Sequence, residues 1–279
     1  MIDEQAFLDT LNQAIDSNKL TLPTLPEVAI QVRSAVEKDQ TTAKEVADII
    51  VTDAALSARL LQVANSPLYR GRVPIDSVQM AVTRLGVRLV RSLVVSLIMQ
   101  QIFQPTHDLL DQKFRQVWEQ SVSIAALSRV LSSNLDHLDK DQAMLGGLIH
   151  NIGALPILAM AENEDELLEN PRELERIVQA LSPTVGTRIL EMWEFPDSLV
   201  KVTGHFLDLS YQSEAEADYV DVVQVARLEA LASDPDSIPM SEWAGIPAFR
   251  KVGVETEVNI IEVEGVADDV ENIEVMFLS

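Results

Sequence analysis

The fold is decided by one stretch of the chain, Ala143-Met144-Leu145-Gly146-Gly147-Leu148-Ile149-His150-Asn151-Ile152-Gly153. Apolar residues dominate this stretch, and paired glycines are typical of places where two helices pack closely, because glycine adds no side chain. We expect a buried helix here, from about Asp141 to Ala161. His150 and Asn151 then carry polar groups into an apolar environment.

Outward from this stretch, apolar residues recur at helical spacing along nearly the whole chain. Thr41 or Thr42, Asp53 and Ser77 can cap helix starts, while Pro183 and Pro196 suit first helical turns. The expected helices cover about residues 7–15, 26–36, 42–50, 53–64, 77–85, 87–103, 109–132, 141–161 and 219–232, with two more beginning at Pro183 and Pro196.

The C-terminal part of the chain is set apart by its composition. Residues 211–218 are polar and indicate a boundary between a main domain, 1–210, and an extension, 211–279, that packs on the same core. Branched residues at Val258–Val263 favour a short strand, and the pattern over 266–278 favours a helix. The predicted fold class is all-α, a multi-helix bundle with an N-terminal helix group and a central group.

Composition restricts the classes of function. A chain of 279 residues with 47% hydrophobic residues can bury a sizeable core, and only 10 glycines and 12 prolines argue against disorder. The net charge of -23 opposes binding to phosphate backbones and anionic lipids, so we expect no nucleic-acid partner and no membrane partner. The absence of cysteine excludes disulfides, zinc–thiolate sites and cysteine nucleophiles.

The first residues and the apolar runs indicate the cellular location of the protein. Residues 1–4 lack the basic region that opens a signal peptide. We take Leu93–Met99 as the longest apolar stretch, and it is too short to span a bilayer. We therefore expect a soluble, cytoplasmic protein.

A second set of motifs lies upstream of residue 143 in a fixed order. It comprises Leu22-Pro23-Thr24-Leu25-Pro26-Glu27-Val28, Ala54-Ala55-Leu56-Ser57-Ala58-Arg59-Leu60-Leu61, Ala64-Asn65-Ser66, the segment from Ser77 to Leu85-Gly86, and a Leu-rich helix from Val87. Together with Ala143–Gly153, this ordered set resembles the HDOD family of bacterial regulatory domains, over about residues 10–250. The resemblance implies a helical fold related to the metal-dependent phosphohydrolases of the HD superfamily.

The resemblance also implies where metal ligands would stand. Metal-assisted hydrolysis needs several converging ligands, because the cation must hold phosphate oxygens and lower the pKa of a bound water. The adjacent His-Asp pair of the HD superfamily is here His150-Asn151, and a neutral carboxamide brings no charge to offset a cation. Gln120 and Ser182 stand where the family pattern shows His, and His205 is the single His of a final His-His pair. Two imidazoles without a carboxylate are too few for a catalytic metal site.

The resemblance thus implies a vestigial HD-type pocket made by Gln120, His150, Asn151, Ser182 and His205, with no catalytic residue, no metal and no cofactor. For His150, two interpretations stay open. It is either a buried imidazole with a hydrogen-bond partner, as is usual for a His on an apolar helix, or a polar remnant that lines the pocket. The same alternatives hold for His205.

Arg84, Arg88 and Arg91 form a local basic cluster around Leu85-Gly86 in an otherwise acidic chain, and Arg70 and Arg72 precede them. The simpler interpretation is that these guanidinium groups form surface salt bridges with the many carboxylates. The alternative is a contact with an acidic partner, since Arg pairs with carboxylate and phosphate groups.

The sequence as a whole predicts a non-catalytic signal-transduction and regulatory module that acts through protein–protein interaction with an unidentified signalling protein. The alternative is a metal-dependent (cyclic) nucleotide phosphohydrolase. The Gly-Tyr-Pro signature of relatives that degrade cyclic di-GMP is absent downstream of His150, which tells against it. Neither glycine-rich nucleotide-binding run is present. The sequence leaves open whether the chain forms a homo-oligomer.

Overall fold

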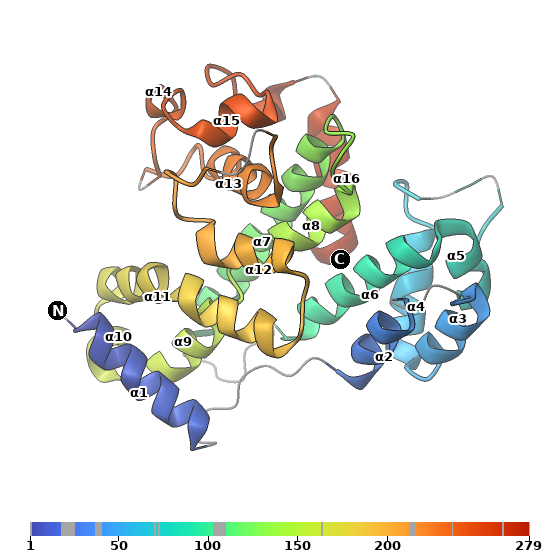
Figure 1. Ribbon diagram of the computed structural model, residues 1–279, viewed down its shortest axis with the longest axis horizontal. Coiled ribbons are helices and arrows are strands. Elements are labelled where there is room, and N and C mark those ends of the chain that lie inside the picture. The colour runs from blue at the N-terminus through green and yellow to red at the C-terminus, as the bar shows by residue number, and fades with distance from the viewer. Residues whose placement is uncertain are drawn as a thin grey trace.

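Every regular element in the described part of the chain is a helix, which confirms the predicted all-α fold class. The computed structural model describes residues 2–17, 26–36, 41–69, 71, 73–102, 110–162, 164–212, 216–235, 237–263 and 265–278. Leu22–Leu25 of the upstream motif and Phe103, at the end of an expected helix, lie outside these residues. Figure 1 shows an N-terminal helix group at one side of the molecule and a larger assembly beside it.

The N-terminal helix group is built from consecutive helices joined by capped turns. It contains α2 (Glu27–Val36), α3 (Ala43–Ile50), α4 (Ala54–Ala64), α5 (Val78–Leu85) and α6 (Val87–Ile102). The side chains of Thr42, Asp53 and Ser77 each accept a hydrogen bond from the backbone N–H three residues later, which confirms the predicted caps. Such a cap stabilises a helix by about 1 kcal/mol. The apolar α6 packs on α2 and α4 and so forms the core of this group.

The central group is arranged around the long helix α7 (Asp111–Ser132), on which α8 (Lys140–Ile149) lies. It continues with α9 (Ala154–Ala161), α10 (Asp165–Leu168), α11 (Pro171–Met192) and α12 (Asp197–His205). A Cβ atom added to Gly147 would lie 2.7 Å from the Cα atom of Ala125 on α7. The glycine therefore permits the close approach of α8 to α7 that the paired glycines predict.

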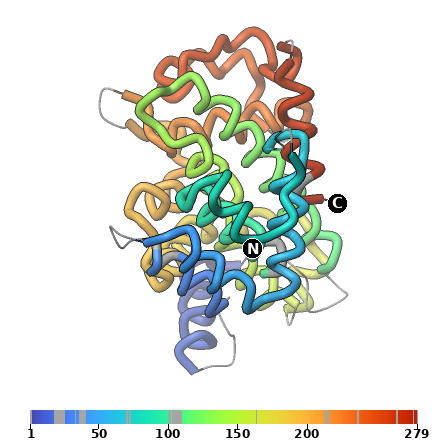
Figure 2. Tube along the Cα trace, turned by 90° about the vertical axis from the view of Figure 1, so that its right-hand side faces the viewer, coloured from blue at the N-terminus to red at the C-terminus, as the bar shows by residue number. Residues whose placement is uncertain are grey.

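The C-terminal segment closes over the central group. It contains α13 (Tyr219–Ala230), α14 (Met240–Trp243), α15 (Pro247–Val252), the 3-10 helix η2 (Ile260–Glu262) and α16 (Val266–Leu278). Both α13 and α16 pack on α7, and the rings of Trp118 and Phe277 meet edge to face at 6.3 Å. In Figure 2, α16 runs in red along one side of the molecule. The domain boundary near residue 211 stays a prediction.

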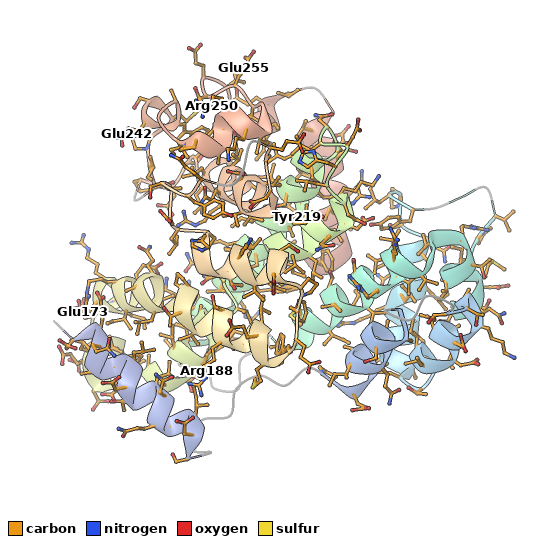
Figure 3. The ribbon with its side chains drawn as sticks, in the orientation of Figure 1. Glu173, Arg188, Tyr219, Glu242, Arg250 and Glu255 are labelled. Atoms are coloured by element: carbon orange, nitrogen blue, oxygen red, sulfur yellow. The ribbon has the colours of Figure 1, made fainter. Side chains whose placement is uncertain are left out.

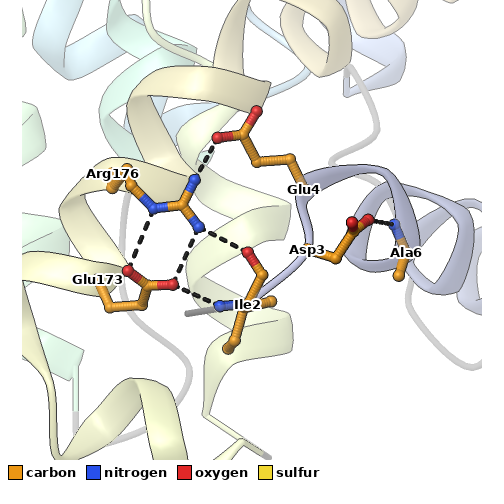
Figure 4. Close-up of polar contacts among 6 residues, drawn as sticks. All are labelled: Ile2, Asp3, Glu4, Ala6, Glu173 and Arg176. Carbon is orange, nitrogen blue, oxygen red and sulfur yellow. Dashed lines mark hydrogen bonds and ion pairs between the residues drawn. The ribbon is translucent and has the colours of Figure 1, made fainter.

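The first helix, α1 (Glu4–Asp16), lies apart from the N-terminal helix group and packs against α11. Figure 3 labels Glu173 and Arg188 on α11, beside α1. Figure 4 shows Arg176 bonded to Glu4, to Glu173 and to the carbonyl oxygen of Ile2. At the other end, Arg188 donates to Asn12 (2.6 Å) and Asp16 (3.1 Å). Long-range polar contacts thus fix α1, and they bring the start of the chain to its middle.

Two helix boundaries differ from the prediction. Pro183 does not begin a helix but lies inside α11, which starts at Pro171 behind the capping side chain of Asn170. Buried residues on both sides of Pro183 hold the helix through the proline, although it lacks an N–H group to bond the preceding turn. The expected single helix over 141–161 is divided into α8 and α9 by a turn at residues 150–153. This turn lies so close to α11 that a side chain on Gly153 would overlap the Ser182 carbonyl oxygen.

The strand predicted at Val258–Val263 is also wrong, because this segment forms η2. The side chain of Asn259 accepts a hydrogen bond from the Ile261 N–H, and the Glu229 carboxylate accepts one from the Ile260 N–H at 3.0 Å. Side chains therefore satisfy the backbone groups that a neighbouring strand would otherwise bond. The helix predicted over 266–278 is confirmed as α16.

Among the described residues, Lys140–Ala161 is long and apolar enough to cross a membrane by composition alone, and it exceeds the Leu93–Met99 run considered above. In the structure, 89% of its most apolar window is buried inside the protein. Its apolar character follows from packing, because α8 lies on α7 and α9 lies on α11, as in the core helices of a globular domain.

Candidate functional site

His150 stands at the end of α8, where the turn toward α9 begins. Its side chain is 3% exposed. The Nδ1 atom lies 2.6 Å from the Gly147 carbonyl oxygen and donates a hydrogen bond to it, and the ring meets Phe206 edge to face at 4.9 Å. The imidazole is therefore packed and bonded on the apolar side of a helix end.

Burial lowers the pKa of His150 to about 4, because the charged imidazolium loses its hydration inside the protein. The hydrogen bond to Gly147 works in the opposite direction, and the positive charge of Arg227 lowers the pKa further. The ring is neutral at pH 7 as a result.

Asn151 and Ser182 lie in the same neighbourhood as His150. The turn at residues 150–153 rests on α11, with Gly153 against the backbone of Ser182 and Gly186. The Oδ1 atom of Asn151 and the Oγ atom of Ser182 are buried, and neither has a hydrogen-bond partner within the described ranges. The turn that carries His150 and Asn151 thus rests on the part of α11 that carries Ser182, and Asn151 and Ser182 each contribute a buried oxygen without a described hydrogen-bond partner.

The other two predicted pocket residues are placed differently. The His205 ring is 45% exposed, lies 3.7 Å from an Asp208 carboxylate oxygen, and packs on Tyr211 at 4.9 Å between ring centroids. The ring that contacts His150 belongs to Phe206, one residue further along. We therefore place Phe206, and not His205, against His150. Gln120 is half-buried on α7, and no hydrogen bond joins it to the other four among the residues described.

The donor set does not fit a catalytic metal ion. Within the part of the chain that the structure describes, no three His, Asp or Glu side chains come close enough to hold one. An imidazole, a carboxamide and a hydroxyl provide one good nitrogen ligand and two neutral oxygens, whereas catalytic sites use three protein ligands and leave one position open.

Arg227 on α13 is a charged residue whose effect on His150 the sequence reasoning missed. The positive charge of Arg227 lowers the pKa of His150. Burial lowers the pKa of Arg227 itself, while the carboxylates of Glu175 and Asp234 raise it. The positive charge of Arg227 therefore disfavours a further positive charge at His150. The signal that could have found Arg227 is its position at the end of the mostly apolar run Val222–Leu228, where it is the single charged residue.

The arginine cluster lies on the N-terminal helix group. Arg84 is exposed and donates to the Val73 carbonyl oxygen at 2.5 Å, Arg88 is exposed, and Arg91 is half-buried. None of these three arginines forms an ion pair with a carboxylate of the described residues. The surface salt bridges that the sequence favours therefore do not form within the described part of the chain. Arg70 and Arg72 fall outside the described residues.

Comparison with known proteins identifies the class. The sequence profile of the HDOD domain matches residues 22–207, which is more than half of the chain. The chain therefore belongs to the HDOD domain family, as the ordered motifs predict. Family membership supports a regulatory role at the level of the family.

Solved structures agree with this fold. A Shewanella amazonensis protein provisionally described as a metal-dependent phosphohydrolase is 29% identical, with a TM-score of 0.83 over 98% of this chain and 99% of its own. An HDOD domain protein of unknown function from Geobacter sulfurreducens is 19% identical, with a TM-score of 0.70 over 99% and 100% of the two chains. A protein from Marinobacter aquaeolei provisionally described as a signal transduction protein is 19% identical, with a TM-score of 0.67 over 100% and 67%.

A curated relative is longer than this chain. An uncharacterized protein of Treponema pallidum (strain Nichols) is 23% identical over 221 residues, which is 74% of this chain and 42% of that protein. The chain thus spans less than half the length of the relative.

Proposed function

We propose that this chain is a non-catalytic signal-transduction module that acts by binding another protein. The observation that carries the proposal is the state of the His-Asp pair, which is His150-Asn151 in this chain. His150 is packed against Phe206 and bonded to Gly147, and no acidic residue joins it to form a ligand set among the described residues.

Electrostatics support the proposal. A hydrolytic metal centre concentrates carboxylates around its cation, whereas His150 here is followed by a neutral carboxamide and feels the positive charge of Arg227. With repulsion from Arg227 and without a charged ligand, a divalent cation has little to offset its loss of hydration. Regulation then requires a binding surface rather than chemistry.

We place the binding surface on the N-terminal helix group, at Arg84, Arg88 and Arg91. These guanidinium groups have no carboxylate partner in the described part of the chain, and they stand out on a chain of net charge -23. They suit an acidic patch on a signalling protein, because complementary charge steers association.

The second candidate function is metal-dependent hydrolysis of a phosphodiester, and the similarity to the Shewanella amazonensis protein favours it. The test is a turnover assay with Mn²⁺, using cyclic di-GMP and bis(p-nitrophenyl) phosphate as substrates. We expect no turnover by the wild type above a His150→Ala control of the same preparation. Turnover that depends on added metal and is lost in the His150→Ala protein would refute the proposal.

A further inference from the structure

The first helix, α1, is docked on a part of the molecule to which it is not directly joined. Its main helix contact is with α11 of the central group, whereas the chain continues from α1 into α2 of the N-terminal helix group. Figure 1 shows α1 beside α11 at one end of the molecule, with α2 away from it. The helix also precedes residues 22–207, which the HDOD profile matches. It is therefore an appendage that packs on the family domain.

The apolar face of α1 is narrow. Phe7 and Leu11 are one turn apart, so they lie on the same face of the helix, and they are its two buried residues. Leu8 and Ile15 are only partly buried. A helix of 13 residues is at most marginally stable in water on its own, since this holds for isolated helices shorter than about 12–15 residues. The helical form of α1 therefore depends on its packing against α11.

Two arginines of α11 hold the two ends of α1, and their spacing matches that of their partners. Arg176 forms an ion pair with Glu4 and donates to the Ile2 carbonyl oxygen at 2.6 Å (Figure 4), while Arg188 pairs with Asp16 at 3.1 Å. Both the arginines and the carboxylates are 12 residues apart, which is about 18 Å along each helix. The two helices thus run in the same direction with their charges in register. We call the face of α11 that carries Arg176 and Arg188 the α1 seat.

The ion pairs of the α1 seat lie at the surface. The exposed fraction of the side chain is 32% for Arg176 and 47% for Glu4 at one end, and 44% for Arg188 and 70% for Asp16 at the other. Water and salt screen such pairs, so they select the register of α1 more than they hold it in place. The attachment of α1 therefore rests mainly on two buried side chains.

A terminal helix of this kind can dock on another copy of the chain through the same contacts. Residues 17–26 join α1 to α2, and ten residues span at most about 33–36 Å. Exchange of an identical element between copies costs little, because each contact that is lost within one chain is regained between two chains. The sequence of α1 itself is the ligand that the seat is known to fit.

We propose that α1 is a displaceable strap on α11, and that the vacated α1 seat accepts the α1 helix of a second copy of the chain. The seat recognises an amphipathic helix with two apolar residues one turn apart and two carboxylates 12 residues apart. It lies on the central group, away from the arginine cluster of the proposed function, and it does not depend on the absence of catalysis at His150.

Fluorescence anisotropy with a labelled peptide of residues 2–17 tests whether the seat binds α1 in trans. The receptor is the full chain with Phe7→Asp/Leu11→Asp, which removes the apolar face of α1 and leaves α11 unchanged. We expect saturable binding at one site per chain, at least about tenfold tighter than binding to the wild type, whose seat is occupied. Equal binding to both proteins, or no saturable binding to the variant, would overturn the inference.

Two peptide variants separate recognition by the seat from general charge attraction. A peptide with Glu4→Gln/Asp16→Asn should bind the same receptor at least about threefold more weakly, because it loses both partners of the seat arginines. The matched control is Asp9→Lys, which changes the net charge of the peptide by the same amount at an exposed position, and it should bind within about twofold of the unchanged peptide. Equal weakening by the two changes would contradict recognition in register.

A charge exchange between chains tests the second copy. One full-length variant reverses the strap, Glu4→Arg/Asp16→Arg, and the other reverses the seat, Arg176→Glu/Arg188→Glu. In the mixture, each α1 meets opposite charges only on the other variant, so we expect a 1:1 complex by sedimentation at about 0.15 M salt, where general repulsion between acidic chains is screened. Neither variant alone should form it, and all four changes in one chain should abolish it.

Circular dichroism and thermal melting follow the fold of every variant. Peptide binding without a complex in the mixture would overturn the assignment of a second copy as the occupant. Loss of folding in the Phe7→Asp/Leu11→Asp protein and in both charge-reversed proteins would show that α1 is an integral part of the core, and would overturn the strap.

Discussion

The three groups around His150 act on one side chain in different ways. The Gly147 carbonyl oxygen fixes the position of the Nδ1 proton, Phe206 packs on the ring, and Arg227 disfavours the imidazolium. His150 therefore contributes to the packing of the core, and it supplies the side-chain hydrogen bond that the Gly147 carbonyl oxygen accepts. This assignment is testable by mutation.

We predict that His150→Ala destabilises the fold by roughly 1–3 kcal/mol, because the Gly147 carbonyl oxygen loses its side-chain donor and Phe206 loses its neighbour. Urea unfolding followed by circular dichroism measures the change. His205→Ala is the matched control, since that ring is 45% exposed, and it should shift stability by less than about 0.5 kcal/mol. Identical unfolding curves for His150→Ala and the wild type would remove the core assignment.

The sequence showed this site in part. His150-Asn151 is visible in the motif, and so is the loss of ligands at Gln120 and Ser182. The motif does not show that Phe206, and not His205, contacts His150, because this depends on the orientation of the last turn of α12. Arg227 was missed because its effect acts through space, from α13 to the end of α8.

At the scale of elements, helices were predicted well where caps and apolar spacing agreed, as for α4 and α5. Errors arose where distant parts of the chain decide the outcome. Glu229 on α13 holds η2 in place of the predicted strand, and packing around Pro183 carries α11 through a residue that usually ends a helix.

Glu229 makes the anchoring of η2 sensitive to pH. Burial raises the pKa of this carboxyl group to about 7, while the hydrogen bond from the Ile260 N–H works against that rise. The pKa in the unfolded chain is near 4.5, so the folded state binds the proton more tightly. The stability contributed by Glu229 is therefore fully present below pH 4.5, falls as the pH rises to about 7, and levels off above that.

We predict that Glu229→Gln flattens this part of the stability profile between pH 4.5 and 7, since a neutral amide can still accept the Ile260 hydrogen bond without carrying a buried charge. Chemical unfolding at several pH values measures the effect. Exposed Glu242→Gln on α14 is the control and should leave the slope unchanged. A slope that is the same in the Glu229→Gln protein and the wild type would contradict the prediction.

At the scale of the whole molecule, the N-terminal helix group carries the arginine cluster, and the central group carries the HD-type residues. This separation allows a binding surface and a degenerate site to lie on different parts of the chain. The position of α1 could not be predicted from its place in the sequence. The first helix packs on α11 of the central group rather than on the helices that follow it in the chain.

We predict that changing Arg84, Arg88 and Arg91 to Gln leaves the fold intact and weakens the capture of an acidic partner, most visibly at low salt, where surface charges are least screened. A pull-down from lysate of the source organism at several salt concentrations measures this. The matched control changes Arg172, Lys201 and Arg250 to Gln, which are exposed elsewhere on the molecule. Equal capture and equal salt sensitivity for both triple variants would assign the cluster no role in binding.

The central claim is that the HD-type site no longer holds a catalytic metal, and elemental analysis of protein purified without chelator tests it most directly. The account predicts iron, manganese and zinc each well below one equivalent per chain, because Asn151 supplies no charge and Arg227 opposes a cation. The same measurement on His150→Ala protein gives the background of adventitious metal. About one or more equivalents in the wild type, lost in the His150→Ala protein, would contradict the account.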